Sequence, residues 1–274
     1  MASKGNANRV TLGERMKEFE EVTTSQTLVK GLPIYARLDM RAGHSFCADL
    51  ERPFDKVYSE TMEYVAGYLL EKTGAKLAYT QSDEISLVWL DHRAVPFENR
   101  VFKMESVFAG MASAAFAVKA MNGKMCAKVA LDPPSFDCRV CNLPTVGDAV
   151  DMIRWRERDC LKNAVTLAAL SVFKTNEIDK KNSVDKIKML AERGFDFETH
   201  IQARYRRGVF LRRREKTLAV TEAELREKGI PEKHWPQPDL FGIRTVTRTV
   251  TESFFPSDII DRLTRDCAAK ELFG

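Results

Sequence analysis

The sequence predicts an α+β fold, with a ferredoxin-type β-α-β-β-α-β core followed by C-terminal helices and a basic strand or hairpin extension. Two observations predict the core: four short strand-like runs lie within the first 145 residues, and two long stretches of helical periodicity separate them. A third observation predicts the extension, because the pattern from Gly147 onward is mainly helical and then becomes rich in arginine. We therefore divide the chain into a core, residues 1–145, and an extension, residues 146–274, that packs on the core as one compact unit.

Composition limits the class of protein. Of the 274 residues, 44% are hydrophobic and 30% are charged, which is typical of a folded globular protein and argues against disorder. No continuous apolar run approaches the roughly 20 residues of a membrane span. Residues 1–9 contain no apolar signal region, so we expect a cytoplasmic protein without a membrane partner. The net charge of +4 permits a nucleic-acid partner without requiring one.

The six cysteines have no spacing typical of a disulfide framework or a zinc site. Cys138 and Cys141 form a C-x-x-C pair, but they lie in a predicted strand, where an offset of three residues points the side chains to opposite faces. No second pair and no nearby histidine completes a zinc site. Metal or redox use is one interpretation of these cysteines, and the pattern favours the other, buried thiols.

The core elements follow one another with clear boundaries. Residues 1–10 are predicted to be a loose end, and residues 12–20 a short amphipathic helix. The predicted core strands cover residues 33–39, 76–81, 84–90 and 136–141. A helix over 53–73 begins at Pro53 and ends at Gly74, and a second helix over 101–121 is rich in small residues. Ser82 and Asp83 form the predicted turn of a hairpin.

The extension begins with predicted helices over 148–174 and 183–193. In the first of these helices we expect Trp155 on the buried side rather than stacked on a base. Residues 205–214 are predicted to be a basic strand, and a Thr/Val/Arg alternation at 243–250 predicts another strand or hairpin arm after a proline-rich loop. Pro256 and Ser257 are the predicted start of a final helix that ends near residue 270.

Two short acidic segments of the chain are predicted to lie side by side in the folded core. In a β-α-β-β-α-β sheet the first and third strands are antiparallel neighbours, so Asp39, which ends the first, lies beside Asp83 and Glu84, which begin the third. Clustered carboxylates repel one another, and hydrated Mg²⁺ relieves that repulsion with oxygen ligands. Two such ions about 4 Å apart form the usual clamp for phosphoryl or nucleotidyl transfer.

The alternative is that Asp39 and Asp83 are turn residues, a common role for aspartate. The neighbours of Asp39 favour the metal site, because Arg37 lies on the same strand face and the following loop supplies Arg41, Gly43 and His44 as anion-binding partners. On its own, His44 is more readily interpreted as a core or capping histidine than as an anion-binding residue. The run 204–214 is either a solvated strand face or an RNA contact, since Tyr205 and Phe210 are interleaved with its arginines and alternation would put Arg204, Arg206 and Arg212 on one side.

A set of short motifs occurs between about residue 12 and about residue 214. The motifs are Leu12-Gly-Glu-Arg-Met-Lys, Ala36-Arg-Leu-Asp39 with Arg41 and His44-Ser-Phe46, Tyr79-Thr-Gln-Ser-Asp-Glu-Ile-Ser86, Lys103 with Ser106 and Ala112-Ser113, Phe136-Asp-Cys-Arg139, Arg154-Trp-Arg-Glu-Arg-Asp159 with Asn163, and Tyr205-Arg-Arg-Gly208. Together, and in this order, they closely resemble the tRNA(His) guanylyltransferase superfamily.

The resemblance implies a palm-like catalytic core and an Mg²⁺-dependent nucleotidyltransferase. Members add nucleotides to the 5′ end of tRNA in the 3′-to-5′ direction. They first activate a 5′-monophosphate with ATP or GTP, and the 3′-hydroxyl of an incoming nucleotide then attacks. The partners implied are tRNA and nucleoside triphosphates, and the assembly implied is a homotetramer.

The resemblance also implies roles for individual residues. Asp39 and Asp83 would bind two Mg²⁺ ions together with the backbone carbonyl of Met40, and Glu84 would support this catalytic cluster. The implied nucleotide-binding residues are Arg37, Asp39, Met40, Arg41, Ala42, Gly43, His44, Ser82, Asp83 and Lys103. The implied RNA-binding residues are Arg139, Arg154, Asn163, Arg206 and Arg207.

Two departures distinguish this chain from the usual family pattern. Met40 replaces a glycine after the first aspartate, and Gly43 replaces a phenylalanine before the histidine. The segment 154–159 resembles the "like proteins" of bacteria, archaea and phages, which are associated with template-dependent repair of tRNA 5′ ends. Three other functions stay open: addition of a single G to tRNA(His), nucleotide cyclisation on the same palm, and RNA binding without catalysis.

Overall fold

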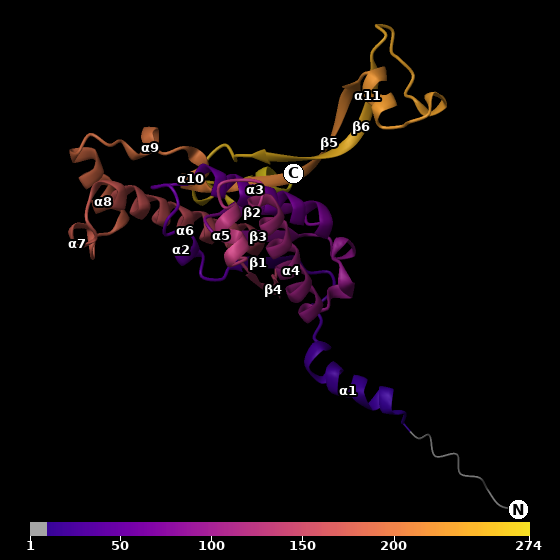
Figure 1. The fold of residues 1–274 in the computed structure, drawn as a ribbon, viewed down its shortest axis with the longest axis horizontal. Coiled ribbons are helices and arrows are strands. Elements are labelled where there is room, and N and C mark those ends of the chain that lie inside the picture. The colour runs from indigo at the N-terminus through magenta and orange to yellow at the C-terminus, as the bar shows by residue number, and fades with distance from the viewer. Residues whose placement is uncertain (1–9) are drawn as a thin grey trace, which may run out of the picture.

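The computed structural model describes residues 10–274, so the predicted loose end lies almost wholly outside the described residues (Figure 1). The core elements are α1 (Leu12–Thr24), β1 (Ile34–Met40), α2 (Gly43–Phe46), α3 (Lys56–Thr73), β2 (Leu77–Gln81), β3 (Glu84–Trp89), α4 (Val101–Ala120), α5 (Cys126–Leu131) and β4 (Phe136–Asn142). The strands and long helices confirm the predicted β-α-β-β-α-β order. The short helices α2 and α5 were not predicted, because single turns carry little periodicity.

The six strands within residues 10–274 form one antiparallel sheet in the order β4-β1-β3-β2-β5-β6, in which β5 (Val209–Val220) and β6 (Arg244–Phe254) belong to the extension. As predicted, β1 pairs with β3, and β1 also pairs with β4. One face carries α3 and α4, which bury Ile34, Ala36 and Leu38 of β1. The other face carries α6 (Val146–Val172) and α12 (Arg265–Phe273), which bury Tyr35 and Tyr79. Successive side chains of β1 therefore point alternately into two apolar layers, one on each face of the sheet.

Two core helices differ from the sequence prediction in detail. α3 begins at Lys56 and not at Pro53, because the side chain of Asp55 accepts the amide hydrogen of Tyr58 and caps the helix. It ends as predicted at Gly74, whose φ of 73° favours glycine. Within residues 10–274, α4 alone has the length and mean hydropathy, 1.4, of a membrane span, although Lys103, Glu105 and Lys119 interrupt its apolar run. One side of α4 packs on α3 and the sheet through Met104, Phe108 and Phe116.

The extension is built on α6. The further elements are α7 (Thr175–Ile178), α8 (Ser183–Glu192), α9 (Phe197–His200), α10 (Ala203–Arg207), β5 (Val209–Val220), α11 (Glu222–Glu227) and β6 (Arg244–Phe254), with single 3-10 turns at His92–Ala94, Phe97–Asn99, Glu232–His234 and Ile260–Arg262. β5 pairs with β2, so the extension continues the sheet of the core. β5 and β6 pair from Phe210 to Val220, and their outer part projects from the body as an arm (Figure 1).

The predicted basic strand is wrong over its first residues. Residues 203–207 form the helix α10, and the strand begins only at Val209. Gly208 makes the change of direction, with a φ of 73° and with a hypothetical Cβ only 2.7 Å from the carbonyl oxygen of Thr80. Arg204 and Arg206 are therefore helical and do not share a strand face with Arg212.

The start of the last helix was also predicted wrongly. α12 begins at Arg265, where the hydroxyl of Thr264 accepts the amide hydrogen of Cys267. The preceding segment, which includes Pro256 and Ser257, has no α-helix. It is held instead by long-range hydrogen bonds that α6 and α10 supply to its backbone carbonyls.

Candidate active site

A row of polar side chains crosses one end of the sheet. The strand registers pair Asp39 of β1 with Asp137 of β4 and with Glu84 of β3, and they pair Glu84 with Gln81 of β2. Residues directly opposite one another in antiparallel strands project from the same face. Because neighbouring strands lie about 4.8 Å apart, the register alone brings Asp39 next to Glu84, as the order of the elements predicts.

Asp83 reaches the same place from the turn between β2 and β3. Its backbone carbonyl accepts a hydrogen bond from the amide of Met40 at 3.0 Å, which ties the turn to the end of β1. A Cβ atom on Gly43 would lie 2.1 Å from Oδ2 of Asp83. Gly43 is therefore required for space, and the side chain of Asp83 keeps its position because residue 43 has none.

The backbone at Met40 does not require the glycine that the family usually has there. The backbone angle φ is positive at Ala42 in this loop, where it is 55°. It is also positive at Ser82 in the facing turn, where it is 48°. Met40 continues the strand, and its side chain is buried against the core, where Tyr58 Oη donates to Sδ at 3.9 Å. The substitution therefore places a core side chain at position 40 and leaves the backbone carbonyl available.

The electrostatics of Asp39 and Asp83 favour a bound cation. Burial raises the pKa of Asp39, and the neighbouring carboxylates of Asp83 and Asp137 raise it further, while Arg37 and Arg139 oppose the rise. Within the described residues, neither Asp39 nor Asp83 makes an ion pair. Two close carboxylates without a counter-ion are what a divalent cation stabilises.

The oxygen donors at this point fit Mg²⁺. This ion is commonly held by one or two carboxylates and by substrate phosphates rather than by a complete set of protein ligands. Asp39 and Asp83, with the backbone carbonyl of Met40, supply such a partial set. Between residues 10 and 274 there is no group of three or more His, Cys, Asp or Glu side chains arranged around one metal position. The remaining ligands would have to come from water and substrate.

Glu84 is not a third free carboxylate. Arg156 Nε donates to Glu84 Oε1 at 2.6 Å, and Arg37 Nε lies 3.9 Å from Oε2. Arg156 also donates to Asp159 at 2.8 Å. Burial raises the pKa of Glu84, and the charge of Arg156 opposes this rise. Glu84 thus orients two arginines beside the acids, and its role in the site is to position them.

Removing Arg156 should destabilise the protein strongly, because Glu84 would remain buried and unpaired. We expect Arg156→Met to lower the free energy of unfolding by about 3 kcal/mol or more. Replacing both partners, as Glu84→Gln with Arg156→Met, should recover much of this loss because no unpaired charge remains. Chemical denaturation measures both changes. The exposed Arg158→Met is the matched control and should change stability little; an equal effect there would contradict this account of Glu84.

Trp155 contradicts its prediction as a core residue. Its side chain is 50% exposed. The buried stripe of α6 runs through Ile153, Arg156 and Glu157, and Trp155 lies off that stripe. The guanidinium of Arg156 lies 4.4 Å and that of Arg37 5.4 Å from the centre of its ring. The indole is therefore held by cation–π contacts at the open edge of the site.

The loop after β1 contributes polar groups to the same region. Arg41, Ala42 and His44 are exposed, and His44 lies in the single turn α2, so it is neither a core nor a capping histidine. Within the described residues, the amides of Ala42, Gly43 and His44 make no backbone hydrogen bond. These amides and the two basic side chains can hold phosphate oxygens.

The predicted RNA-binding residues fall into two groups, one exposed and one bound to other parts of the protein. Arg139 is exposed on β4 beside Asp137, and Asn163 is exposed on α6. Arg154 and Arg207 instead hold the segment before α12: Arg154 donates to the carbonyl of Ile260 at 3.0 Å, and Arg207 donates to that of Pro256 at 3.1 Å. Arg206 pairs with Glu198. These last three arginines have structural partners.

Lys103 lies away from the site. It is exposed in the first turn of α4, and that end of the helix packs at the far end of the sheet, where Phe108 stacks on Trp89. The opposite end of α4 approaches the site, where Phe116 contacts Phe46. Thirteen residues of helix between positions 103 and 116 correspond to about 20 Å, so the expected phosphate contact of Lys103 does not arise within one chain.

Sequence reasoning missed three residues of the site: Arg156, Asp137 and Gln81. Arg154 and Arg156 both lie in the motif, and residues two apart point in nearly opposite directions on a helix. The sequence alone did not tell which one faces the sheet. The strand register identifies the other two, because Asp137 is paired with Asp39 and Gln81 is paired with Glu84.

The sheet with its two carboxylates and flanking helices defines a palm-type nucleotidyltransferase core. Residues 13–144 match the family model described as tRNA(His) guanylyltransferase. The chain is similar to a bacterial tRNA(His) guanylyltransferase-like protein solved with ATP, with a TM-score of 0.66 and 26% identity over 74% of this chain and 87% of that one. A structure of such a protein with GTP shares the fold, with a TM-score of 0.69 and 21% identity over 96% of this chain and 99% of that one.

A curated relative, the tRNA(His) guanylyltransferase of Schizosaccharomyces pombe, is 31% identical over 148 residues, which are 52% of this chain and 56% of that protein. Just under half of this chain, residues 13–144, therefore matches the tRNA(His) guanylyltransferase superfamily, whose members are nucleotidyltransferases that act on tRNA. The resemblance found in the motifs is therefore confirmed.

Proposed function

We propose that this protein adds nucleotides to the 5′ end of tRNA in the 3′-to-5′ direction and repairs truncated 5′ ends with an RNA template. The observation that carries the proposal is that Asp39, near the end of β1, and Asp83, in the turn before β3, are brought together beside a loop of free amides. The motif Arg154–Asp159, which resembles the repair branch, supports template-dependent addition. ATP or GTP would activate the 5′-monophosphate before each incoming nucleoside triphosphate is joined.

In this proposal the acidic residues of the site would bind cations, and the basic residues and free amides would bind phosphates. Asp39, Asp83 and the carbonyl of Met40 would hold two Mg²⁺ ions, which when bound lower the pKa of an attacking hydroxyl and stabilise the leaving pyrophosphate. The amides of residues 42–44, with Arg41, His44 and Ser82, would bind the triphosphate. Arg37 lies on the strand face of Asp39 and is oriented by Glu84, so it can contact a phosphate beside the carboxylates.

The tRNA would approach from the open edge of the sheet. Arg139 is exposed on β4, and Trp155 is exposed beside Arg37. A basic side chain next to an exposed indole is typical of a surface that binds both phosphates and unstacked bases. Asn163 remains a candidate contact, whereas Arg154, Arg206 and Arg207 would act by shaping the surface.

Template dependence can be separated from addition of a single G. The protein would be incubated with Mg²⁺, ATP and a 5′-monophosphorylated tRNA that lacks one 5′ nucleotide, in four versions that differ in the unpaired template base. Each nucleoside triphosphate would be supplied separately. We expect the nucleotide complementary to the template base to be added in every version. Addition of G alone, whatever the template base, would identify the single-G activity instead.

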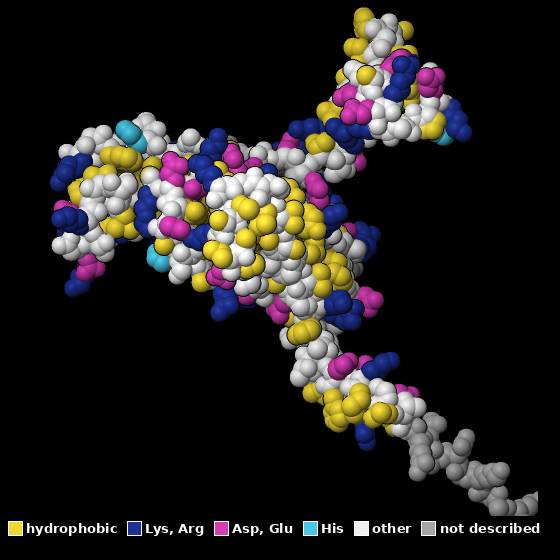
Figure 2. Space-filling view, viewed as in Figure 1, with side chains coloured by type: hydrophobic (Ala, Val, Ile, Leu, Met, Phe, Trp, Pro, Cys, Tyr) yellow, Lys and Arg dark blue, Asp and Glu magenta, His cyan; other side chains and the backbone are white. Residues whose placement is uncertain are grey.

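We also propose that the protein assembles as a homotetramer, as the resemblance implies. α1 supports this proposal, because Leu12, Phe19 and Val22 form an uncovered apolar strip on a helix that stands away from the body (Figure 2). An isolated amphipathic helix of this length is only marginally stable without a packing partner. Sedimentation equilibrium should give four times the chain mass of 31.1 kDa; a monomer at micromolar concentration would exclude the assembly.

A further inference from the structure

One tryptophan lies at the surface beside the carboxylates. The side chain of Trp155 is 50% exposed, whereas Trp89 and Trp235, the other two tryptophans of the chain, are 1% and 8% exposed. An indole is mostly apolar, so leaving half of it in water forgoes part of the free energy that burial would give. The exposure of Trp155 therefore calls for a reason that the two buried tryptophans do not.

Two arginines hold this indole in a fixed place. The guanidinium carbons of Arg156 and Arg37 lie 4.4 Å and 5.4 Å from the centre of the ring. Both arginines are held in turn by Glu84, whose carboxylate lies 2.6 Å from Nε of Arg156 and 3.9 Å from Nε of Arg37. A side chain with fixed neighbours loses little further freedom when it contacts a ligand, so the indole is a preorganised surface.

The indole lies on the same side of the sheet as Asp39. Side chains two residues apart on a strand share a face, so Arg37 and Asp39 both point to the side on which α6 buries Tyr35. Two residues of strand span about 7 Å, which places Trp155, through its contact with Arg37, next to the carboxylates. The other exposed phenylalanine and tyrosine side chains of residues 10–274 belong to other parts of the fold: Phe19 on α1, Tyr64 on α3, Phe102 at the start of α4, Phe241 in the arm and Phe255 after β6.

Template-dependent addition requires an RNA base that is held by its face. The unpaired base opposite the missing nucleotide must keep its hydrogen-bonding edge free for the incoming nucleotide. Hydrogen bonds from side chains would occupy that edge and would favour one base over the others. Stacking on an aromatic ring holds any base, because every base has a π face, and it leaves the edge free. We therefore expect the residue that holds the template base to be aromatic, exposed and next to the carboxylates, as Trp155 is.

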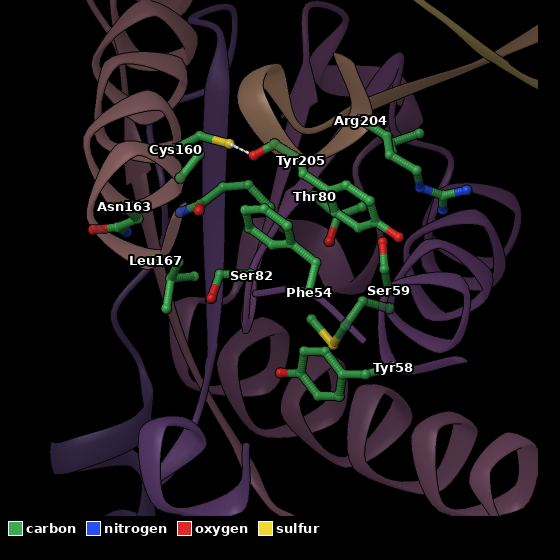
Figure 3. Close-up of a pocket in the computed structure, with 14 residues that line it drawn as sticks. Phe54, Tyr58, Ser59, Thr80, Ser82, Cys160, Asn163, Leu167, Arg204 and Tyr205 are labelled. Atoms are coloured by element: carbon green, nitrogen blue, oxygen red, sulfur yellow. Dashed lines mark hydrogen bonds between the residues drawn. The ribbon is translucent and has the colours of Figure 1, made fainter. Parts of the chain in front are cut away.

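The cleft at the end of β2 is not an alternative place for this base. Figure 3 shows that Asn163 and Leu167 of α6 line it, together with Phe54 and Tyr205. Its cavity volume is about 60 Å³, well below the range of small-molecule sites. The rings of Phe54 and Tyr205 stack on each other, with centres 4.5 Å apart and an interplanar angle of 7°, so their facing sides are already covered.

We propose that Trp155 is a positioning residue on which the unpaired template base of a 5′-truncated tRNA stacks. The base is held by its face, whatever its identity, while the 5′ end of the RNA lies at Asp39 and Asp83. Arg37, which lies between the indole and the carboxylates, contacts a phosphate of the same RNA end. This inference deepens the proposed function, and it rests on that function for the tRNA substrate and for the place of its 5′ end.

Tryptophan fluorescence tests the contact, since a base stacked on an indole quenches its emission. Truncated tRNAs with each of the four template bases, and a matched RNA whose template position is abasic, would be titrated with Mg²⁺ and without nucleoside triphosphates. The proteins are the wild type, Trp155→Phe and the control Trp235→Phe, which removes a buried tryptophan. We expect the RNAs with a template base to quench the wild type and Trp235→Phe but not Trp155→Phe, and the abasic RNA to quench none of them.

Filter binding of the same RNAs to Trp155→Ala tests what the contact contributes. We expect this variant to bind the RNAs with a template base about tenfold more weakly than the wild type, by a similar factor for each base. It should bind the abasic RNA as the wild type does, because the stacking partner is then absent on both sides of the comparison. If Trp155→Ala does not fold by circular dichroism, Trp155→Leu replaces it, because leucine keeps an apolar contact with the guanidiniums but has no aromatic face.

Four results would overturn the inference. An equal loss of affinity for the abasic and the intact RNAs would show that Trp155 only supports Arg37. Unchanged affinity for the intact RNAs would show that the indole holds no base. A loss confined to one template base would show that the base is read by its edge. Protection of Trp155 from acrylamide before RNA is added would show that another copy of the chain covers it. Failure of the proposed function is distinct, since the template base would then quench the wild type although no complementary nucleotide is added.

Discussion

Replacing either Asp39 or Asp83 with alanine is expected to abolish nucleotide addition. Each variant removes one of the two carboxylates that we propose hold the cations, and loss of a preorganised electrostatic group typically lowers the rate about a hundred- to a thousand-fold. Binding of tRNA should change little, because it depends mainly on contacts between basic side chains and phosphates. Single-turnover assays with labelled tRNA measure the first quantity, and filter binding measures the second.

Asp137→Ala is the matched control for this experiment. Asp137 lies in the same row as Asp39 but is exposed on the edge strand, 3.7 Å from Arg139. Its loss should leave the rate within about one order of magnitude of the wild type, because its carboxylate only adds to the local negative potential. Near-normal turnover of Asp39→Ala or Asp83→Ala would refute the two-cation assignment, whatever the control shows.

Gly43→Ala should be the most damaging conservative substitution in the loop. The new Cβ would lie 2.1 Å from Oδ2 of Asp83, and it also meets Cβ and Cγ of that residue at 2.8 Å, so the carboxylate must move. A displacement of about 1 Å at a catalytic group can cost about a hundredfold in rate. We expect such a loss in the single-turnover rate, with a melting temperature close to that of the wild type.

Gly110→Ala provides the comparison, because nothing lies within 4 Å of the Cβ that it would add to α4. Alanine is favoured over glycine in a helix by about 1 kcal/mol, so this variant should be as stable as the wild type or more stable, with unchanged activity. Equal activity of Gly43→Ala and Gly110→Ala would mean that Asp83 is not fixed by the close approach of residue 43.

The core of the fold was predictable because its signals are local. Period-two runs and helical stretches gave the β-α-β-β-α-β order, and this order alone places the end of β1 beside the start of β3. The meeting of Asp39 with Asp83 and Glu84 therefore followed from topology. The actual register was needed to show that Glu84 is paired with Arg156 and that Gln81 continues the row.

The errors have a common physical cause, which is that tertiary contacts override local pattern. Tyr205 to Arg207 alternate like a strand, but the chain can pass close to Thr80 only at Gly208, so pairing starts after it. Trp155 has the composition of a core residue, yet the stripe of α6 that faces the sheet leaves it outside. The long distance from Lys103 to the carboxylates depends on the direction of α4, which no motif encodes.

The most direct test of the central claim is to map the product formed on a 5′-monophosphorylated, 5′-truncated tRNA. The wild type would be incubated with this RNA, Mg²⁺, ATP and the four nucleoside triphosphates, and both ends of the product would be sequenced. If Asp39 and Asp83 form the proposed site, the RNA grows at its 5′ end, and growth stops when Mg²⁺ is removed with EDTA. Growth at the 3′ end, or a cyclic nucleotide formed without RNA, would contradict it.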